Sequence, residues 1–240
     1  MTAPTEICTD ECRAPEARPS RFVNAPRIHT AVTASLEKRL LTWMAHRTPA
    51  AINSDHLTAL GFVAQILAGG AYALASRDAR SLWLVNLFLV LNWLGDSLDG
   101  TLARVRNRQR PRYGFYVDHV ADTFGALALM AGLGCSGYVH WPIAAGMLAG
   151  YYVLSIESYL ATYTLGRFHL SHGLFGPTEL RILLIAGNIA LLHRPYATLA
   201  GGPFLLFDVG GVVAIAAMAV MAVAAALRHT AALYREERLG

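Results

Sequence analysis

The chain has 240 residues, of which 55% are hydrophobic and only 15% are charged. Soluble domains carry about a quarter charged residues, so this composition excludes an ordinary soluble globular protein. The net charge of +4 indicates contact with anionic lipid rather than nucleic acid, because the basic residues flank apolar segments.

Residues 1–30 are expected to form a disordered tail. They are polar, rich in proline, and lack the apolar segment of a signal peptide. Cys8 and Cys12 have the spacing of one helical turn, but no histidine or second cysteine pair accompanies them. Neither a zinc site nor a disulfide framework is therefore predicted.

Residues 31–50 are predicted to form an amphipathic juxtamembrane helix. Apolar residues recur at helical spacing between residues 31 and 47, and basic residues surround them. This pattern is typical of a helix that lies in the membrane interface. A helix packed on the membrane domain is the alternative, and the two arrangements are compatible.

Residues 51–240 are predicted to form a six-helix membrane catalytic domain, which makes the fold class an all-α integral membrane bundle. Several apolar runs reach 20 residues, enough to cross a hydrocarbon core of about 30 Å. One soluble domain of this length cannot bury so many nearly uncharged helices. Pro195 and the run 201–203 shorten the fifth helix. The predicted helices are residues 57–76, 82–103, 114–135, 142–164, 178–193 and 205–227.

Arginines are concentrated on one side of these helices. The loop of residues 104–112 is rich in arginine, and residues 167–181 and the C-terminal tail also carry basic residues. The opposite loops hold only Arg77, Arg80 and Arg194. The positive-inside rule therefore places both termini and the arginine-rich loop in the cytoplasm. We expect a multi-pass protein of a bacterial inner membrane.

Four aspartates mark the second and third predicted membrane helices. Asp96 and Asp99 are three residues apart, and Asp118 and Asp122 are four apart, so each pair shares a helix face. A short loop joins the two helices, which should run antiparallel. Both acidic pairs are therefore expected near the cytoplasmic ends of neighbouring helices, where they can face each other.

These carboxylates are costly at membrane depth. Each costs roughly 2.5–3.5 kcal/mol on insertion scales, and four unpaired ones would cost on the order of 10 kcal/mol. They are expected to meet cations, to be protonated or to line a wet cavity. Hard divalent cations with oxygen ligands fit best. The sequence therefore predicts two Mg²⁺ or Mn²⁺ ions in an acidic site suited to phosphoryl transfer.

Small and basic residues follow the first acidic pair. Gly100 would let a phosphate or base approach the backbone, or would allow close helix packing instead. Ala103 lies on a similar face, and Arg104 is suited to a phosphate oxygen or to a positive-inside anchor. Gly114 is expected to allow a close helix contact.

The pattern Asp-x2-Asp-Gly-x2-Ala-Arg, then nine residues, then Gly-x3-Asp-x3-Asp, runs from Asp96 to Asp122. It resembles the signature of the class I CDP-alcohol phosphotransferase (CDP-alcohol phosphatidyltransferase) family, and every fixed position is present. The spacer is one residue longer than in the most familiar form, which affects which loop arginine contacts substrate. The resemblance implies a six-helix topology over about residues 50–230 and a homodimer.

The resemblance also implies roles for the matching residues. Asp96, Asp99 and Asp118 would hold the metals, while Asp122 would complete the metal site and act as general base on the acceptor hydroxyl. The CDP-activated donor would contact Gly100, Ala103 and Arg104.

Other residues are weaker candidates. The family often begins its first membrane helix with Pro-Asn-x-x-Thr, and the matching stretch here makes Asp55 and Thr58 candidates for donor binding. Helix capping by Ser54 and Asp55 is the alternative. Arg181 would bind an acceptor phosphate, or anchor a helix start. Glu157, within a membrane helix, is either functional or a packing residue.

The resemblance implies an enzyme of phospholipid biosynthesis. It would transfer a phosphatidyl group from a CDP-alcohol, with CDP-diacylglycerol preferred, to an acceptor alcohol with release of CMP. The alternative is CDP-choline or CDP-ethanolamine with diacylglycerol, which the Asp118–His119 pair favours. An intramembrane prenyltransferase would release pyrophosphate, and a cation transporter would show ion flux without nucleotide consumption.

Overall fold

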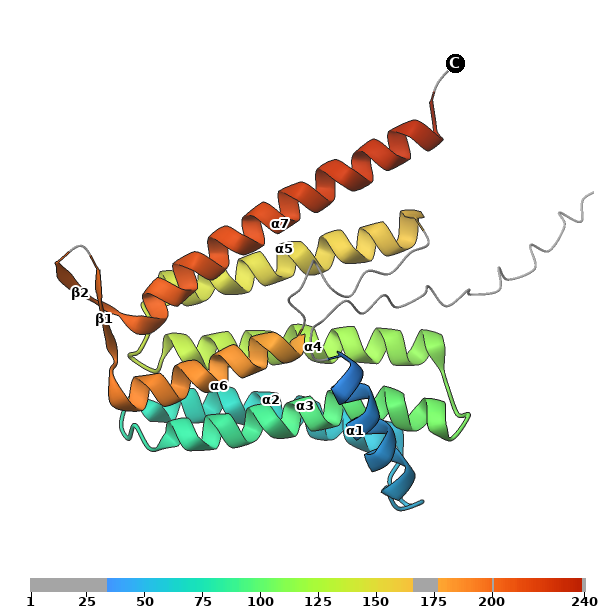
Figure 1. Ribbon diagram of the computed structural model, residues 1–240, viewed down its shortest axis with the longest axis horizontal. Coiled ribbons are helices and arrows are strands. Elements are labelled where there is room, and N and C mark those ends of the chain that lie inside the picture. The colour runs from blue at the N-terminus through green and yellow to red at the C-terminus, as the bar shows by residue number, and fades with distance from the viewer. Residues whose placement is uncertain (1–33, 166–176, 200, 239–240) are drawn as a thin grey trace, which may run out of the picture.

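The computed structural model describes residues 34–165, 177–199 and 201–238. This part of the chain forms seven helices and one short hairpin, so the predicted all-helical architecture is confirmed (Figure 1). The predicted tail, with Cys8 and Cys12, lies outside the described residues. The elements are α1 (Ala34–Arg47), α2 (Ser54–Ala75), α3 (Ser81–Val105), α4 (Pro111–Gly134), α5 (Trp141–Leu165), α6 (Pro177–His193), β1 (Tyr196–Leu199), β2 (Gly202–Leu205) and α7 (Leu206–Glu236).

The helix α2 occupies the centre of the larger group of helices, because it packs against both α3 and α4. In turn, α1 and α6 pack on α3, while α5 packs on α4 and on α7. Figure 1 shows α5 and α7 side by side along one edge of the bundle. The acidic helices α3 and α4 run antiparallel, as predicted, and α2 is their common neighbour (Figure 1).

The last helix differs most from its predicted range. It begins at Leu206 but continues to Glu236, nine residues beyond the predicted end at 227. The extension contains alanine, leucine, arginine and glutamate, which favour helix, and it contains no glycine or proline. Hydropathy marks where an apolar segment ends, whereas helix propensity decides where the helix itself ends.

A hairpin follows α6, at the position where the sequence indicated only a helix break. Its strands are antiparallel, with Tyr196 opposite Leu205 and Leu199 opposite Gly202. Gly201, in the turn, has φ of +84°, a backbone conformation that favours glycine. The glycine that shortens the fifth helix therefore also builds the turn of this hairpin (Figure 1).

Four of the described helices are long and apolar enough to span a membrane, namely α2, α3, α5 and α7. The chain is therefore a membrane protein, but the six predicted spans are not all reproduced by this criterion. The helix α4 carries Asp118 and Asp122, which lower its mean hydropathy, and α6 has only 17 residues. Two acidic side chains on one helix and a short length in the other account for the difference.

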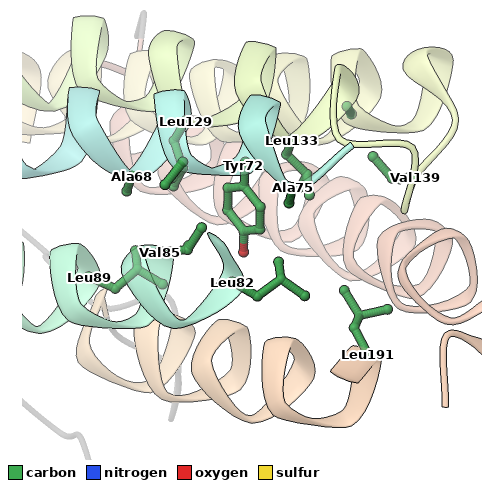
Figure 2. Close-up of a cluster of buried hydrophobic side chains, with 12 residues drawn as sticks. Ala68, Tyr72, Ala75, Leu82, Val85, Leu89, Leu129, Leu133, Val139 and Leu191 are labelled. Atoms are coloured by element: carbon green, nitrogen blue, oxygen red, sulfur yellow. The ribbon is translucent and has the colours of Figure 1, made fainter. Parts of the chain in front are cut away.

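The main apolar core lies between α2, α3, α4 and α6. Figure 2 shows Tyr72 reaching from α2 toward Leu82 and Val85 of α3, with Leu191 of α6 nearby. The Tyr72 hydroxyl donates to Asn188 Oδ1 of α6 at 2.9 Å. Buried polar groups need such partners, so this bond fixes α6 against α2 within an apolar environment.

Candidate functional site

A cleft between α2, α3 and α4 brings together the residues that the sequence singled out. All four predicted metal ligands line it, although they come from two helices separated by a loop. Thr58, a weaker candidate from the sequence, also lines it. The complete lining consists of Thr58, Gly61, Phe62 and Gln65 of α2, Asn92, Asp96 and Asp99 of α3, and Asp118, Ala121 and Asp122 of α4.

A close crossing of α2 and α3 positions the acidic residues of α3. A Cβ atom added to Gly95 would lie 2.5 Å from the backbone nitrogen of Gly61 and 2.6 Å from the carbonyl oxygen of Leu57. No side chain fits at that distance, so glycine is required there. The residue after Gly95 is Asp96, and the crossing therefore places this carboxylate at the wall of the cleft.

Hydrogen bonds orient the Asp99 carboxylate. The Thr58 hydroxyl donates to Asp99 Oδ2 at 2.6 Å, and the backbone N–H of Gly100 donates to Asp99 Oδ1. Ser54 Oγ donates to the Asp99 carbonyl oxygen at 3.0 Å. Capping by Ser54 is therefore wrong, because its hydroxyl bonds α3 and the residue before α2 is Asn53.

Arg181 enters the site from α6 and binds Asp96. Its guanidinium donates to Asp96 Oδ2 at 2.7 Å through Nη2 and to Asn92 Oδ1 at 2.7 Å through Nε. The Arg181 side chain is only 12% exposed, so this is a partly desolvated, charge-assisted contact. The alternative of a helix-start anchor is therefore not supported for Arg181, because its side chain points into the protein and binds Asp96. The structure places it at the acidic cleft, where the sequence proposed an acceptor-binding residue.

Asn92 is a site residue that the sequence reasoning missed. Its side-chain amide donates to the Gly61 carbonyl at 3.0 Å and to Gln65 Oε1 at 3.3 Å, while its oxygen accepts from Arg181. Asn92 precedes Asp96 by one helical turn, so it lies on the same helix face. A polar amide in that register, within an apolar helix, was the signal that could have identified it.

The donor set suits a hard divalent cation, because four carboxylates line one cleft and oxygen is the ligand that Mg²⁺ prefers. In the described part of the chain, however, no three histidine, cysteine or acidic side chains are gathered closely enough to hold an ion. Asp96 is engaged by Arg181, and Asp99 by Thr58. The residue chemistry fits the predicted metals, while metal binding itself stays a prediction.

A second cavity, with a volume of about 370 Å³, lies beside the cleft. The two are neighbours through Ser54, which lines the second cavity and bonds Asp99 of the cleft. The start of α2 forms one side of this cavity, and arginines of the α3–α4 loop form another. Its lining consists of Asn53, Ser54, Asp55, Leu102, Ala103, Arg106, Arg108, Gln109 and Arg110.

Two of the loop arginines bind groups at and before the start of α2. Arg106 donates to carbonyl oxygens of the α1–α2 connection, including Ile52 at 2.5 Å and Thr48 at 2.8 Å. Arg110 pairs with Asp55, and this hydrogen bond raises the pKa of the Arg110 guanidinium. Asn107 has φ of +52°, so the loop that carries the longer spacer turns through a left-handed residue.

The residues after the first acidic pair differ in their surroundings. Among the described residues, a Cβ on Gly100 would meet only the Arg104 guanidinium, at 3.5 Å. The alternative of a helix-packing glycine is therefore wrong at this position. Arg104 donates to the Thr101 hydroxyl at 3.0 Å, and Ala103 lines the second cavity. The close contact expected at Gly114 is absent from the described residues.

The remaining acceptor candidates lie elsewhere or outside the described residues. Glu157 of α5 lies 2.5 Å from His229 Nδ1 of α7, a pair that joins these two helices. Its packing role is therefore visible in the structure. Arg167, His169 and His172, in the basic segment that follows the fourth predicted helix, lie outside the described residues.

The fold and the cleft define a helical membrane protein whose acidic site is formed by two antiparallel helices that both pack on α2. Over residues 51–229, the chain matches the CDP-alcohol phosphatidyltransferase family. Because this match covers most of the chain, the chain belongs to that family, and the resemblance noted from the sequence is confirmed. A comparison with curated protein sequences gave no match.

Proposed function

We propose that the chain transfers a phosphatidyl group from CDP-diacylglycerol to an acceptor alcohol, with release of CMP. Family membership supports phosphatidyl transfer from a CDP-alcohol. The observation that carries the site assignment is the cleft lined by Asp96, Asp99, Asp118 and Asp122. The reaction belongs to phospholipid biosynthesis.

The donor is assigned to the cleft and the neighbouring cavity together. Its diphosphate would lie against Asp96 and Asp99, where divalent ions bound by the four aspartates would neutralise the negative charge of the phosphates. Gly100 leaves space beside the helix, and Ala103 lines the larger cavity. The nucleotide would occupy that cavity, with Arg104, Asp55 and Thr58 as the predicted contacts of the donor.

Asp122 is assigned as the general base. It lines the cleft one helical turn after Asp118, and therefore faces the same space as the donor phosphates. Asp122 would remove the proton from the acceptor hydroxyl. The acceptor oxygen would then form a bond to the phosphorus that carries the lipid alcohol, and the bond from that phosphorus to CMP would break.

Arg181 is assigned to the acceptor side of the cleft. Its guanidinium already lies within hydrogen-bond distance of Asp96, although it comes from α6 rather than from the motif. A guanidinium suits a phosphate on the acceptor because its donors match phosphate geometry. When the donor diphosphate binds, Asp96 would turn from Arg181 toward the phosphates, which would leave the guanidinium available to the acceptor.

The membrane arrangement is part of the same proposal. The helices α4 and α6 pack alongside the four apolar spans, so six spans with the acidic cleft at the cytoplasmic side account for the arginine distribution. The membrane would be a bacterial inner membrane and the enzyme a homodimer. Accessibility of single cysteines at the α3–α4 loop and in the β1–β2 hairpin to an impermeant maleimide, in inverted vesicles, tests this orientation.

The test of function is release of radiolabelled CMP and transfer of label to lipid by purified protein. The assay contains CDP-diacylglycerol, Mg²⁺ or Mn²⁺, and a panel of alcohols, and a parallel set contains CDP-choline or CDP-ethanolamine with diacylglycerol. The proposal expects turnover with the first donor and its loss in Asp122→Asn. The matched control is Asp78→Asn, an exposed carboxylate in the α2–α3 loop.

Each other outcome points to a different reaction. Turnover only in the parallel set would assign the amino-alcohol donors instead of CDP-diacylglycerol. Pyrophosphate release from a prenyl diphosphate would favour a prenyltransferase, and ion flux without nucleotide consumption would favour a transporter. Full turnover by Asp122→Asn would rule out Asp122 as the base while leaving the reaction in place.

A further inference from the structure

Glu37 of α1 joins two helices of the site through one carboxylate oxygen. Its Oε1 accepts hydrogen bonds from Trp93 Nε1 at 2.9 Å and from Ser97 Oγ at 3.3 Å, both on α3. The same oxygen accepts from Thr178 Oγ1 of α6 at 3.1 Å. Three donors from two helices that are distant in sequence therefore converge on one atom.

The three donors are neighbours of the residues that line the cleft. Trp93 follows Asn92 in the chain, Ser97 follows Asp96, and Thr178 precedes Arg181 by about one helical turn. Glu37 therefore binds α3 and α6 at the level where Arg181 contacts Asp96. In Figure 1, α1 lies across the end of α3, beside the start of α6.

Polar contacts hold α6 in its position along α3. This helix has 17 residues, and most of its large apolar side chains are exposed or only partly buried. Its fully buried Asn188 bonds Tyr72 at 2.9 Å and Asn86 at 2.8 Å, at the end of the helix farther from the cleft. Thr178 makes the corresponding contact at the near end, and Arg181 lies between the two.

We propose that Glu37 is a positioning residue of the transferase site, which acts by fixing α6 so that the Arg181 guanidinium stays at the acidic cleft. This inference rests on the proposed function. It concerns a residue that precedes residues 51–229, the part of the chain that matches the family. The helix α1 is then more than a membrane-interface helix, because it sets the position of a substrate-binding arginine.

The first test compares Glu37→Ala with Glu37→Gln in the CMP-release assay. Alanine removes the acceptor of three hydrogen bonds, and kcat/KM is expected to fall about tenfold, mainly through a higher acceptor KM. Glutamine keeps an acceptor oxygen and is expected to restore activity to within about threefold of the wild type. The control is Lys38→Ala, an exposed neighbour on the same helix, which should leave kcat/KM unchanged.

A double-mutant cycle tests whether Glu37 acts through Arg181. In an Arg181→Lys background, which keeps the charge and lowers activity, Glu37→Ala is expected to reduce kcat/KM less than about twofold further. Loss of the same factor in both backgrounds would overturn the proposal, because it would show that Glu37 acts independently of Arg181. Equal activity of Glu37→Ala and the wild type would also overturn it.

A second cycle is independent of catalysis. Glu37→Ala, Thr178→Val and the double variant are unfolded thermally in detergent, and the effects on Tm are expected to be non-additive because the two residues share a contact. Strictly additive effects would overturn the proposal even if the enzyme is active. A wild-type protein without CMP release would instead reject the proposed function, while this cycle would still report on the contact.

Discussion

Replacing Thr58 by valine tests how the cleft holds Asp99. The Thr58 hydroxyl lies 2.6 Å from Asp99 Oδ2 and 3.1 Å from the Ser54 carbonyl oxygen of its own helix. A hydroxyl has one proton to donate, and the shorter distance assigns it to the carboxylate. Valine has the same branched shape but no donor, so it removes this bond with little change in packing.

The expected loss follows from the kind of bond removed. A hydrogen bond to a charged group is worth about 1.5–3 kcal/mol. The site is only part-buried, which favours the lower end, and Asp99 keeps the N–H of Gly100 as a donor. About 1.5 kcal/mol corresponds to a reduction of roughly tenfold in kcat/KM for the CDP-alcohol donor.

The assay is CMP release at varied donor concentration, with protein folding checked by thermal unfolding in detergent. Thr58→Ser keeps the hydroxyl and should stay within about threefold of the wild type. Thr164→Val is the matched control, because within the part of the chain that the structure describes the Thr164 hydroxyl donates to the Leu160 carbonyl of its own exposed helix segment and to no other group. Wild-type kcat/KM in Thr58→Val, or an equal loss in both Thr58 variants, would refute the assignment.

Three further predictions follow from the packing and from the donor set. Gly95→Ala should lower the free energy of unfolding by about 1–3 kcal/mol and abolish most activity, because its Cβ would overlap α2. Gly70→Ala should be tolerated, because the described residues leave open space there, and thermal unfolding compares the two variants. Tyr72→Phe should lower the free energy of unfolding in detergent by about 0.6–1.7 kcal/mol, since it removes the donor to Asn188. Tyr234→Phe should leave it unchanged, because the Tyr234 side chain is exposed. Exhaustive chelation should abolish CMP release, with recovery on addition of Mg²⁺ or Mn²⁺, and full activity after chelation would contradict the role of the four aspartates.

Local patterns predicted the helices and the acidic cleft well. Helical periodicity places residues three or four apart on one face, so the spacing of Asp96 with Asp99 and of Asp118 with Asp122 was enough to predict two acidic faces. The short connection between the helices predicted that the faces would meet, and all four residues line one cleft. These inferences need only distances along the chain, which the sequence gives directly.

Contacts between distant helices were harder to predict. Arg181 and Asp96 are 85 residues apart, and Glu37 and Thr178 are 141 apart. Whether such residues meet depends on the rotation and the longitudinal position of each helix, and hydropathy specifies neither. The sequence therefore identified Arg181 as a candidate but not its partner, and it gave no reason to select Glu37.

These long-range contacts converge on α3, which explains why this helix organises the site. Its small residue Gly95 admits α2, its Asn92 and Asp96 bind Arg181 of α6, and its Ser97 binds Glu37 of α1. Apolar surface alone holds helices weakly in a membrane, because lipid chains are as apolar as the side chains they would replace. Length and hydropathy therefore decide that these helices enter the bilayer, whereas close backbone contact and polar pairs decide the register in which they meet. A change in that register would move Asp96 away from the acids of α4, and the chemistry proposed for the cleft depends on keeping them together.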